Sequence, residues 1–375
     1  MKEHKVKKVV YVISGINYSL GFDWLDQYLD RTRFEPVFVF LNQTEPSLVH
    51  LLQKRGTTVI YFHLGSKKDY PTILLKLIQL FLKIRPDIVH AHLFDANLLA
   101  MSAAFLTGVK RRVYTRHHST YHHDYHPSMV KYDRLVNSLS THIASISENV
   151  TSIMVSREKV NPSKIFLVHH GFELKKFQEV DRVKVDALRS KYKVESHFPV
   201  IGVISRFTSW KGIQFIIPAF KQLLVKYPDA VLLLANASGD YESEIDKLLE
   251  GIPSHSYRKI AFETDLFSFY QLFDIFVHVP VDEYAEAYGQ IYVEALASGI
   301  PSVFTLSGVA REFIVNEENA LVVPFKDAIA ILNAMERILK DDKIRERISL
   351  NGPHAVRGRF EVTNMMNTLY KLYEA

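Results

Sequence analysis

Cysteine is absent from the 375-residue sequence, which excludes a disulfide scaffold, a thiolate metal site and a catalytic Cys nucleophile. Long hydrophobic runs are also missing. The longest apolar stretch, residues 73–84, is interrupted by Lys76, Gln79 and Lys83, and it falls far short of the roughly 20 apolar residues that a membrane span needs. Glycine and proline are scarce, and 47% hydrophobic with 23% charged residues excludes disordered and collagen-like chains.

The start of the chain lacks a secretory pattern. MKEHKVKK runs directly into the short apolar run VVYVIS, without the longer apolar region and small-residue cleavage site of a signal peptide. We therefore expect a cytoplasmic location. The formal net charge of +5 favours anionic partners, among which phosphates, anionic lipid and nucleic acid are all open at this point.

Short apolar runs alternate with helix-like stretches along the whole chain. The runs are residues 9–13, 37–41, 58–62, 87–90, 112–115, 142–145 and 165–168, then 199–204, 231–235, 259–262, 275–279, 302–306 and 321–323. Intervening stretches such as 71–84 and 95–106 are long enough for the crossovers that parallel strands require. This pattern predicts an α/β fold with two Rossmann-like, doubly wound domains.

The length also predicts two domains, because one hydrophobic core rarely serves so many residues. No long apolar run crosses residues 171–193, so the boundary is expected there. We predict a first domain over residues 1–175 and a second over 176–359. The final helix-like segment, 360–375, is expected to return to the first domain, and a ligand is expected between the two domains.

The first candidate binding loop is SRFTSWKG, residues 205–212, which follows an apolar strand and opens a helix. A loop of this kind offers backbone N–H groups and a favourable helix dipole to an anion. Arg206 and Lys211 add a planar guanidinium and a compact ammonium that could hold one diphosphate. The alternative is that both side chains are merely solvated on a surface loop.

The second candidate loop is EAYGQIYVEALASGIP, residues 286–301, between two apolar strands. Glu286 and Glu294 are eight residues apart, about 12 Å along a helix, which would suit the ribose and the sugar of a nucleotide sugar. Gly289 would let the backbone approach the ligand closely. Alternatively, Glu286 is an ordinary helix-start charge. Glu294 is harder to explain this way, because a lone charge in an apolar run is costly without a partner.

These two motifs resemble those of the retaining glycosyltransferases of family 4, which have the two-domain GT-B fold. Glu286 and Glu294 match the family's E-x7-E pattern, and Arg206 with Lys211 matches its G-R-x4-K-G loop, except that Ser205 replaces the usual Gly. Weaker matches lie at RPDIVHAHLFDAN (residues 85–97), at VHHGFELKKF (168–177) and in the final helix.

The resemblance implies transfer of a sugar from a nucleotide diphosphate sugar, with a UDP-sugar favoured, to a glycan or lipid-linked acceptor. Configuration would be retained, and no metal would be obligatory. Arg206 and Lys211 would hold the diphosphate, Glu286 the donor sugar and Glu294 the ribose. Backbone around the donor sugar would come from Tyr288, Gly289 and Gln290.

The resemblance also assigns residues in the first domain. The family's donor-sugar histidine follows a strand in a T-x-H pattern, which selects His117 here, and the leaving phosphate would help to deprotonate the acceptor. Gly15 would contribute to phosphate binding, although many relatives have two glycines in that loop. The candidate catalytic residues are therefore Glu286, His117, Arg206 and Lys211.

Two further features leave alternatives open. Five histidines lie in RHHSTYHHDYHP, residues 116–127, and we weigh acceptor contacts against plain surface histidines, with a metal site the least favoured option. Residues 71–84 have a broad apolar face beside a basic surface, which indicates either a core helix or peripheral contact with the anionic inner face of a membrane.

Rival functions are a nucleotide-sugar 2-epimerase and a non-catalytic nucleotide-sugar-binding protein. No aromatic-interleaved RNA motif or zinc finger is present, so a nucleic-acid partner is not expected. No G-x-G-x-x-G follows the first strand of either domain, which disfavours a dinucleotide dehydrogenase.

Overall fold

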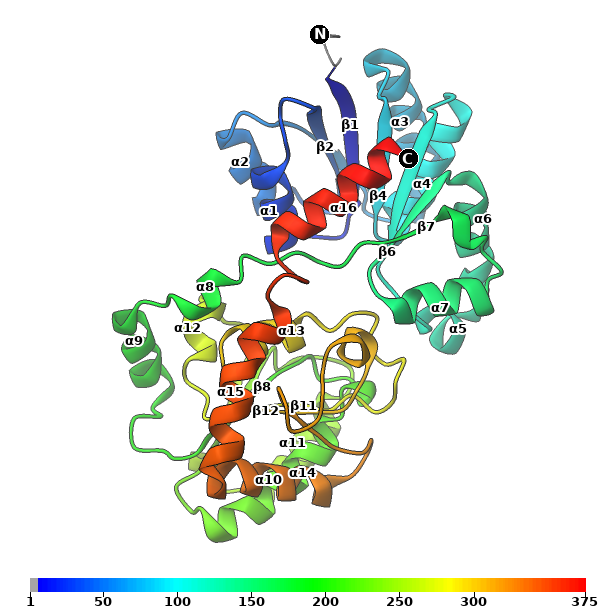
Figure 1. The fold of residues 1–375 in the computed structure, drawn as a ribbon. Coiled ribbons are helices and arrows are strands. Elements are labelled where there is room, and N and C mark those ends of the chain that lie inside the picture. Colours follow the sequence, from blue (N-terminus) through cyan, green and yellow to red (C-terminus); the bar gives the residue numbers. More distant parts are fainter. Residues whose placement is uncertain (1–5) are drawn as a thin grey trace. The chain divides into compact units, whose positions relative to one another are not determined.

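The computed structural model describes residues 6–375, and the chain forms two compact units (Figure 1). Unit 1 extends to Phe172 and is completed by Val362–Ala375, whereas unit 2 is Glu173–Glu361. Residues 1–5, part of the stretch that we interpreted as lacking a signal peptide, lie outside the described residues.

Unit 1 is built on a parallel sheet of seven strands among the described residues, in the order β3-β2-β1-β4-β5-β6-β7. In the central strand β1, the side chains from Val9 to Ile13 alternate in direction and are all fully buried. The sheet is therefore covered on both faces. The strands are β1 Lys7–Ser14, β2 Phe34–Asn42, β3 Thr58–His63, β4 Ile88–His92, β5 Arg111–Arg116, β6 His142–Ser145 and β7 Ile165–Leu167.

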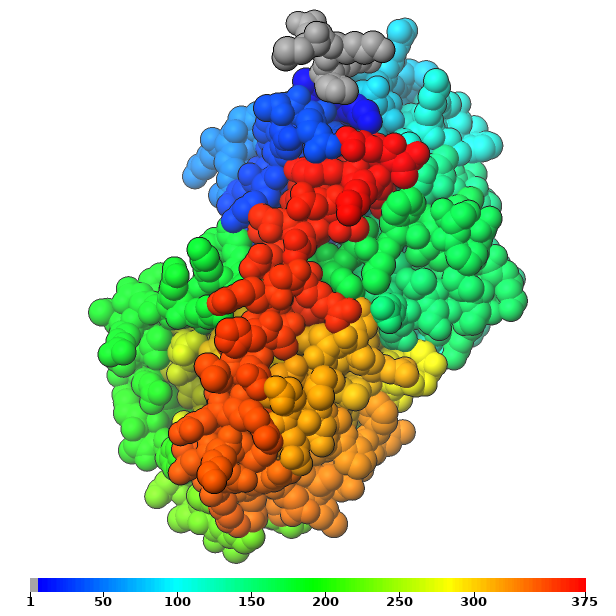
Figure 2. Space-filling model, in the orientation of Figure 1, coloured from blue at the N-terminus to red at the C-terminus, as the bar shows by residue number. Residues whose placement is uncertain are grey.

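Helices connect these strands. They are α1 Leu20–Tyr28, α2 Ser47–Lys54, α3 Tyr70–Ile84, α4 Phe94–Leu106, α5 Tyr121–Tyr125, α6 Val130–Leu139 and α7 Glu148–Ser156. The last helix of the chain, α16 Val362–Glu374, packs against α1, and Tyr370 Oη accepts a hydrogen bond from the Asp30 backbone N–H. In Figure 2 this red segment covers part of the blue N-terminal region. The predicted return of the C-terminal helix to the first domain is confirmed.

Unit 2 has a parallel six-stranded sheet in the order β10-β9-β8-β11-β12-β13. The strands are β8 Val200–Ile204, β9 Val231–Ala235, β10 Tyr257–Ile260, β11 Ile275–His278, β12 Ser302–Phe304 and β13 Leu321–Val322. The helices are α8 Lys175–Gln178, α9 Arg182–Tyr192, α10 Ile213–Lys226, α11 Glu242–Leu249, α12 Leu266–Tyr270, α13 Gln290–Ala297, α14 Ala328–Lys340 and α15 Asp342–Val356.

Strand order identifies where a ligand can bind in each sheet. In unit 1 the chain turns in opposite directions from neighbouring strands β1 and β4, and in unit 2 it does so from β8 and β11. The crevice beyond the carboxyl ends of such a strand pair is the usual ligand position in open α/β sheets. The loops after β8 and β11 contain the two motifs singled out above.

The predicted α/β fold is confirmed, and each predicted apolar run overlaps an observed strand. One run was placed too late: residues 259–262 were expected, but the strand is Tyr257–Ile260, since Phe262 is 72% exposed after the strand has ended. Between residues 6 and 375, none of the helices has the length and hydropathy that crossing a bilayer would require.

Candidate functional site

The loop after β8 positions Arg206 and Lys211. Its backbone is held by hydrogen bonds from Thr208 N–H to the Arg206 carbonyl and from Lys211 N–H to the Thr208 carbonyl. Gly212 is the N-cap of α10 and has a left-handed backbone at φ 78°, where a Cβ would lie only 1.8 Å from the Val279 carbonyl oxygen. Gly212 is therefore required for the loop to lie directly against the end of β11.

Lys211 reaches Glu286, which comes from the loop after β11. Lys211 Nζ lies 2.5 Å from Glu286 Oε1, and His278 Nε2 lies 3.0 Å from the same oxygen. Burial opposes ionisation of Glu286, but the Lys211 ammonium and the His278 hydrogen bond outweigh it and lower the pKa of Glu286 to about 2. Burial lowers the pKa of His278, so a neutral imidazole donates to this carboxylate.

Arg206 differs from Lys211 in its surroundings. Its side chain is exposed and makes no hydrogen bond or ion pair with any residue between 6 and 375. The structure thus brings Lys211 and Glu286 into direct contact, and it places Arg206 on the same loop with its guanidinium uncommitted. A guanidinium in this state can bind phosphate oxygens through two parallel hydrogen bonds.

The segment before α13 is held in place by contacts with residues 307–309. Glu286 N–H donates to Ser307 Oγ at 2.9 Å, and Val309 N–H donates to the Tyr288 carbonyl at 2.9 Å. Gly289 caps α13 at φ 86°, a conformation that brings it against the Tyr292 ring and would crowd any Cβ. Tyr288 is buried beside it, whereas Gln290, the first helical residue, is exposed.

This geometry corrects one expectation. Glu286 and Glu294 were placed on one helix, but α13 begins at Gln290 and Glu286 lies in the loop before it. The hydrogen bond from Glu286 N–H to Ser307 Oγ holds this loop. The left-handed backbone of Gly289 prevents the helix from extending further toward the N-terminus.

Glu294 lies inside the protein on α13, with only 6% of its surface exposed. Burial raises the pKa of Glu294 to about 7, although a hydrogen bond from Tyr270 Oη to Oε2, 2.9 Å long, acts in the opposite direction. Tyr270 is thus the partner that a carboxylate in an apolar run was expected to need. A carboxyl group with a pKa near neutrality changes charge easily when a ligand donates hydrogen bonds to it.

Gly15 and His117 belong to unit 1. Gly15 follows β1 with φ 66°, and its N–H is shared between the Leu41 carbonyl at 3.2 Å and Asn42 Oδ1 at 3.0 Å. That N–H is already engaged, so any phosphate contact by Gly15 would have to displace these acceptors. The role of Gly15 in binding remains a prediction.

His117 follows β5 and lies among other neutral histidines. Its Nε2 is 3.2 Å from His92 Nδ1, and its ring stacks on the His170 ring with centroids 5.6 Å apart. Burial, together with the neighbouring imidazoles, holds the pKa values of His92 and His117 well below the usual range. Both side chains are therefore uncharged at physiological pH.

The histidines of residues 118–126 differ in burial: His126 is exposed, whereas His118 and His122 contact a buried carboxylate. His122 is buried and its Nδ1 lies 2.7 Å from Asp133 Oδ2, while His118 Nε2 lies 3.5 Å from Asp133 Oδ1. Arg116 approaches the same carboxylate at 3.0 Å and also contacts Glu158. The surface interpretation is wrong for His122, because Asp133 and Arg116 draw this segment into a buried polar network.

Three of these groups could in principle hold a cation. The ligand atoms of His118, His122 and Asp133 lie within 4.8 Å of one another. However, hydrogen bonds from both histidines and the charge of Arg116 already satisfy Asp133, and, against the effect of burial, they keep its pKa well below the usual range. The expectation that no metal is obligatory stays a prediction.

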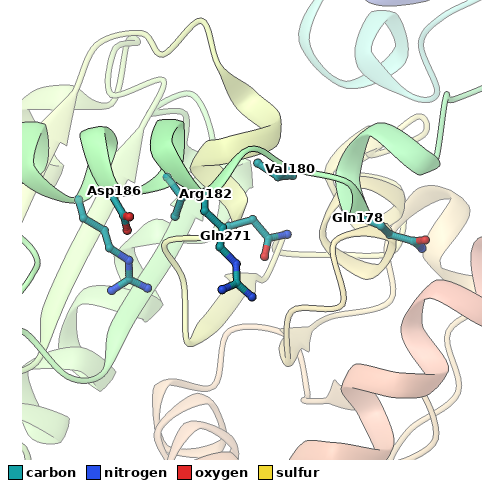
Figure 3. A pocket seen from close by; sticks show the side chains of 7 residues that line it. Gln178, Val180, Arg182, Asp186 and Gln271 are labelled. Atoms are coloured by element: carbon teal, nitrogen blue, oxygen red, sulfur yellow. The ribbon is translucent and has the colours of Figure 1, made fainter.

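A hollow of about 630 Å³ lies elsewhere in unit 2 (Figure 3). Its lining comes mainly from α9 and the segment before it, and the labelled residues are Gln178, Val180, Arg182, Asp186 and Gln271. Gln271 donates to the Phe177 carbonyl at 3.1 Å, so it closes the hollow against α8. None of the candidate residues named above lines this hollow.

Sequence reasoning missed three residues that contact the candidate site. They are His278, Tyr270 and Ser307, which contact Glu286 or Glu294. Only His278 had a visible signal, since a polar residue ends the otherwise apolar strand IFVH. Tyr270 and Ser307 come from segments with no motif, and tertiary structure alone brings them to the two glutamates.

Comparisons with known proteins agree with these motifs. The family model "Glycosyltransferase Family 4" matches residues 25–176, and "Glycosyl transferases group 1" matches residues 184–355. A capsular polysaccharide biosynthesis glycosyltransferase, CapM of Staphylococcus aureus, is 28% identical over 349 residues, which cover 88% of each chain.

Two further similarities extend over most of the chain. A D-inositol 3-phosphate glycosyltransferase of Corynebacterium diphtheriae is 24% identical, with 84% of this chain and 79% of that protein covered. The crystal structure of Anabaena HepE in complex with UDP and glucose superposes with a TM-score of 0.84 at 18% identity, covering 98% of this chain and 99% of that one. The last similarity shows the fold, which is GT-B.

Proposed function

This chain belongs to the group 1, family 4 glycosyltransferases, and we propose that it transfers a hexosyl group from a UDP-sugar to a glycan or lipid-linked acceptor with retention of configuration. The observation that carries the proposal is the contact between Lys211 and Glu286 beside the N-terminus of α13. It joins a phosphate-binding cation to a sugar-binding carboxylate at the edge where the β8 and β11 loops meet.

The chemistry follows from the charges at this edge. Departure of UDP leaves negative charge on the β-phosphate, and the Lys211 ammonium with the uncommitted Arg206 guanidinium would stabilise it. Glu286 stays ionised, so its oxygens accept hydrogen bonds from sugar hydroxyls. The α13 N-terminus adds N–H groups at Gly289 and Gln290 that favour an anion.

Nucleotide binding would depend on Glu294. Its carboxylate would accept hydrogen bonds from the two ribose hydroxyls, with Tyr270 fixing one oxygen. The departing phosphate would take the acceptor proton, so no protein nucleophile is required. We assign nucleotide-sugar binding to unit 2 and acceptor binding to unit 1, where His117 would contact the donor sugar.

The acceptor side of the proposal includes a lipid surface. On α3, Ile73, Leu77 and Phe81 are buried, so the helix does pack on the core, yet Leu75 and Leu82 are about 60% exposed beside lysines 76 and 83. Adjacent α4 ends in exposed Phe105 and Leu106. Exposed leucines among lysines suit an anionic membrane that holds a lipid-linked acceptor.

The proposed place in metabolism is synthesis of a surface polysaccharide or glycolipid. CapM is described as acting in capsular polysaccharide biosynthesis, and that similarity covers most of both chains. The rival 2-epimerase activity would convert one nucleotide sugar into its epimer, and no acceptor-dependent formation of UDP would be seen. A non-catalytic binding protein would bind UDP but would produce none from a nucleotide sugar.

A thermal-shift panel tests the donor. Wild-type protein is melted with UDP, GDP, ADP and their common sugar conjugates, and we expect the melting temperature to rise with UDP compounds because they bind the folded state. The Arg206→Ala, Lys211→Ala double variant should lose the shift. Lys247→Ala, Arg345→Ala is the matched control, since it removes one lysine and one arginine from exposed helical ion pairs of the same unit.

Product assays on the same nucleotide sugars separate the rival functions. Coupled detection of UDP release in the presence of glycan and lipid-linked acceptors identifies transfer. A UDP-dependent melting shift with no UDP release from any donor and acceptor pair would replace the transferase proposal by a binding function. Interconversion of the nucleotide sugar, seen by chromatography, would favour the epimerase.

A further inference from the structure

Two histidines at the end of β4 differ in how their ring nitrogens are used. In His90 both are engaged: Nδ1 lies 2.7 Å from Tyr373 Oη and Nε2 lies 2.8 Å from Thr115 Oγ1. In His92 only Nδ1 has a partner, which is His117 Nε2 at 3.2 Å. His92 Nε2 is fully buried and has no hydrogen-bond partner among residues 6–375.

The surroundings of His92 explain why this nitrogen is left alone. The Phe22 ring packs in a T-shaped arrangement against His92, with ring centroids 4.9 Å apart. The His90 ring, two residues earlier on the same strand, has its centroid 4.2 Å from that of His92. Only 6% of the His92 surface is exposed. The side chain therefore has one direction in which it can form a hydrogen bond, and that direction leads to His117.

This arrangement determines which atom carries the proton. If His117 donated from Nε2, His92 Nδ1 would accept, and a neutral His92 would have a buried N–H at Nε2 with no acceptor. If His92 donates from Nδ1 instead, its Nε2 has only an unused lone pair. Buried N–H groups without acceptors are rarer in proteins than acceptors without donors, so the second tautomer is favoured.

We infer that His92 is a positioning residue, which fixes His117 as a neutral imidazole with its proton on Nδ1 and so makes it a hydrogen-bond donor to an oxygen of the bound sugar. The inference rests on the proposed function of His117 at the donor sugar. His117 Nδ1 has no partner among residues 6–375, and the side chain is only part-buried, so this atom is available to a ligand.

His170 supports the same assignment. Its ring is within 15° of parallel to the His117 ring. The stack holds the plane of His117, and the His92 hydrogen bond selects its tautomer, so orientation and proton position are fixed before a ligand binds. The subsite would accordingly favour a sugar with an oxygen, rather than a hydroxyl proton, directed at His117.

Nuclear magnetic resonance tests the tautomer without substrate. Protein labelled with ¹⁵N histidine gives separate resonance ranges for protonated and unprotonated ring nitrogens, and His117 is assigned by comparison with His117→Asn. We expect a protonated Nδ1 and an unprotonated Nε2 at His117. A proton on Nε2 would overturn the inference.

Variants of His92 test the consequence. The amide of His92→Asn can donate from nearly the position of Nδ1, whereas His92→Leu cannot. We expect His92→Asn to stay within about threefold of wild type in UDP release, and His92→Leu to lose about tenfold in kcat with little change in KM. His90→Asn is the matched control, because His90 is a buried neighbour on the same strand that does not bond to His117.

The outcomes are distinct. Equal losses in His92→Asn and His92→Leu, or an equal loss in the His90 control, would mean a packing role and would overturn the inference. The expected tautomer with unchanged kcat in His92→Leu would also overturn it, while leaving transfer by the wild type established. Absence of UDP release by wild type would instead remove the proposed function, and the resonance measurement would still decide the tautomer.

Discussion

Lys211 and Glu286 are separated by 75 residues in the sequence and form a contact ion pair at the edge of the unit 2 sheet. The pair is largely buried, with side-chain exposures of 17% and 9%, so neither charge is stabilised mainly by water. Removing one partner therefore leaves the other in an unfavourable environment. This coupling determines how variants at either position must be interpreted.

The first prediction concerns this pair. Lys211→Ala should lower kcat about 100-fold, because charge on the leaving UDP loses its main stabilising cation. The pKa of Glu286 should rise in the same variant. In the double variant Lys211→Ala, Glu286→Gln, the loss in kcat should be smaller than the product of the two single losses; strictly multiplicative losses would contradict the coupling.

The second prediction concerns Glu294 and pH. Its pKa near 7 means that the carboxylate must lose a proton to accept two ribose hydroxyls. UDP affinity should then be about tenfold weaker at pH 6 than at pH 8, measured by calorimetry. Glu294→Gln should bind UDP weakly at both pH values and retain only the pH dependence of UDP itself. If UDP affinity changed equally with pH in wild type and in Glu294→Gln, this role of Glu294 would be excluded.

The third prediction is the stability effect of the same group. Because the pKa of Glu294 is raised from 4.5 to about 7 on folding, the folded state binds the extra proton, and stability should fall as pH rises through that window. The change is up to about 3 kcal/mol. Glu294→Gln should therefore melt at a higher temperature than wild type at pH 8 and at nearly the same temperature at pH 4.5.

The fourth prediction separates steric overlap from backbone strain at glycine. Gly212 and Gly56 have nearly the same φ, 78° and 79°, but a Cβ at Gly212 would overlap the Val279 carbonyl, whereas at Gly56 nothing lies within 4 Å. Gly56→Ala should cost about 1 kcal/mol, the price of the left-handed conformation alone. Gly212→Ala should cost about 3 kcal/mol or more and abolish UDP binding; similar melting temperatures for the two would contradict the overlap.

The fifth prediction tests the lipid surface. Wild type should bind vesicles of phosphatidylglycerol at low salt, bind less as salt screens the lysines, and ignore phosphatidylcholine. Leu75→Glu, Leu82→Glu should abolish binding. Val225→Glu, Leu350→Glu is the control, since it changes two apolar residues of unit 2 that are even more exposed than Leu75 and Leu82. Binding that survives the first pair of changes would remove the α3 surface from the proposal.

Much of the fold could be predicted because strands that are buried on both faces have continuous apolar sequences. VVYVI in β1 and VLLLA in β9 are examples, and both strands lie within the sheets where the runs were expected. The exact position of β10 was harder, because Phe262 extends the apolar character beyond the last strand residue although its side chain faces solvent.

The site could be predicted from the sequence only where residues that are close in the sequence act together. Arg206 and Lys211 share a loop, so their proximity follows from spacing, whereas the contacts from Tyr270 to Glu294 and from His278 to Glu286 depend on how β11 and α12 pack. The local rule also failed at Glu286: helical spacing was assumed across Gly289, but this left-handed residue is the N-cap, and the helix begins only after it.

Unit 1 contains both ends of the described chain, since α16 supplies buried Tyr373 to the same strand layer that holds Tyr11 and His90. A ribosome makes α16 after all of unit 2 has been synthesised. The hydrogen-bonded interior of unit 1 is therefore complete only after unit 2 has been made, and unit 2 can mature first although most of unit 1 precedes it in the sequence.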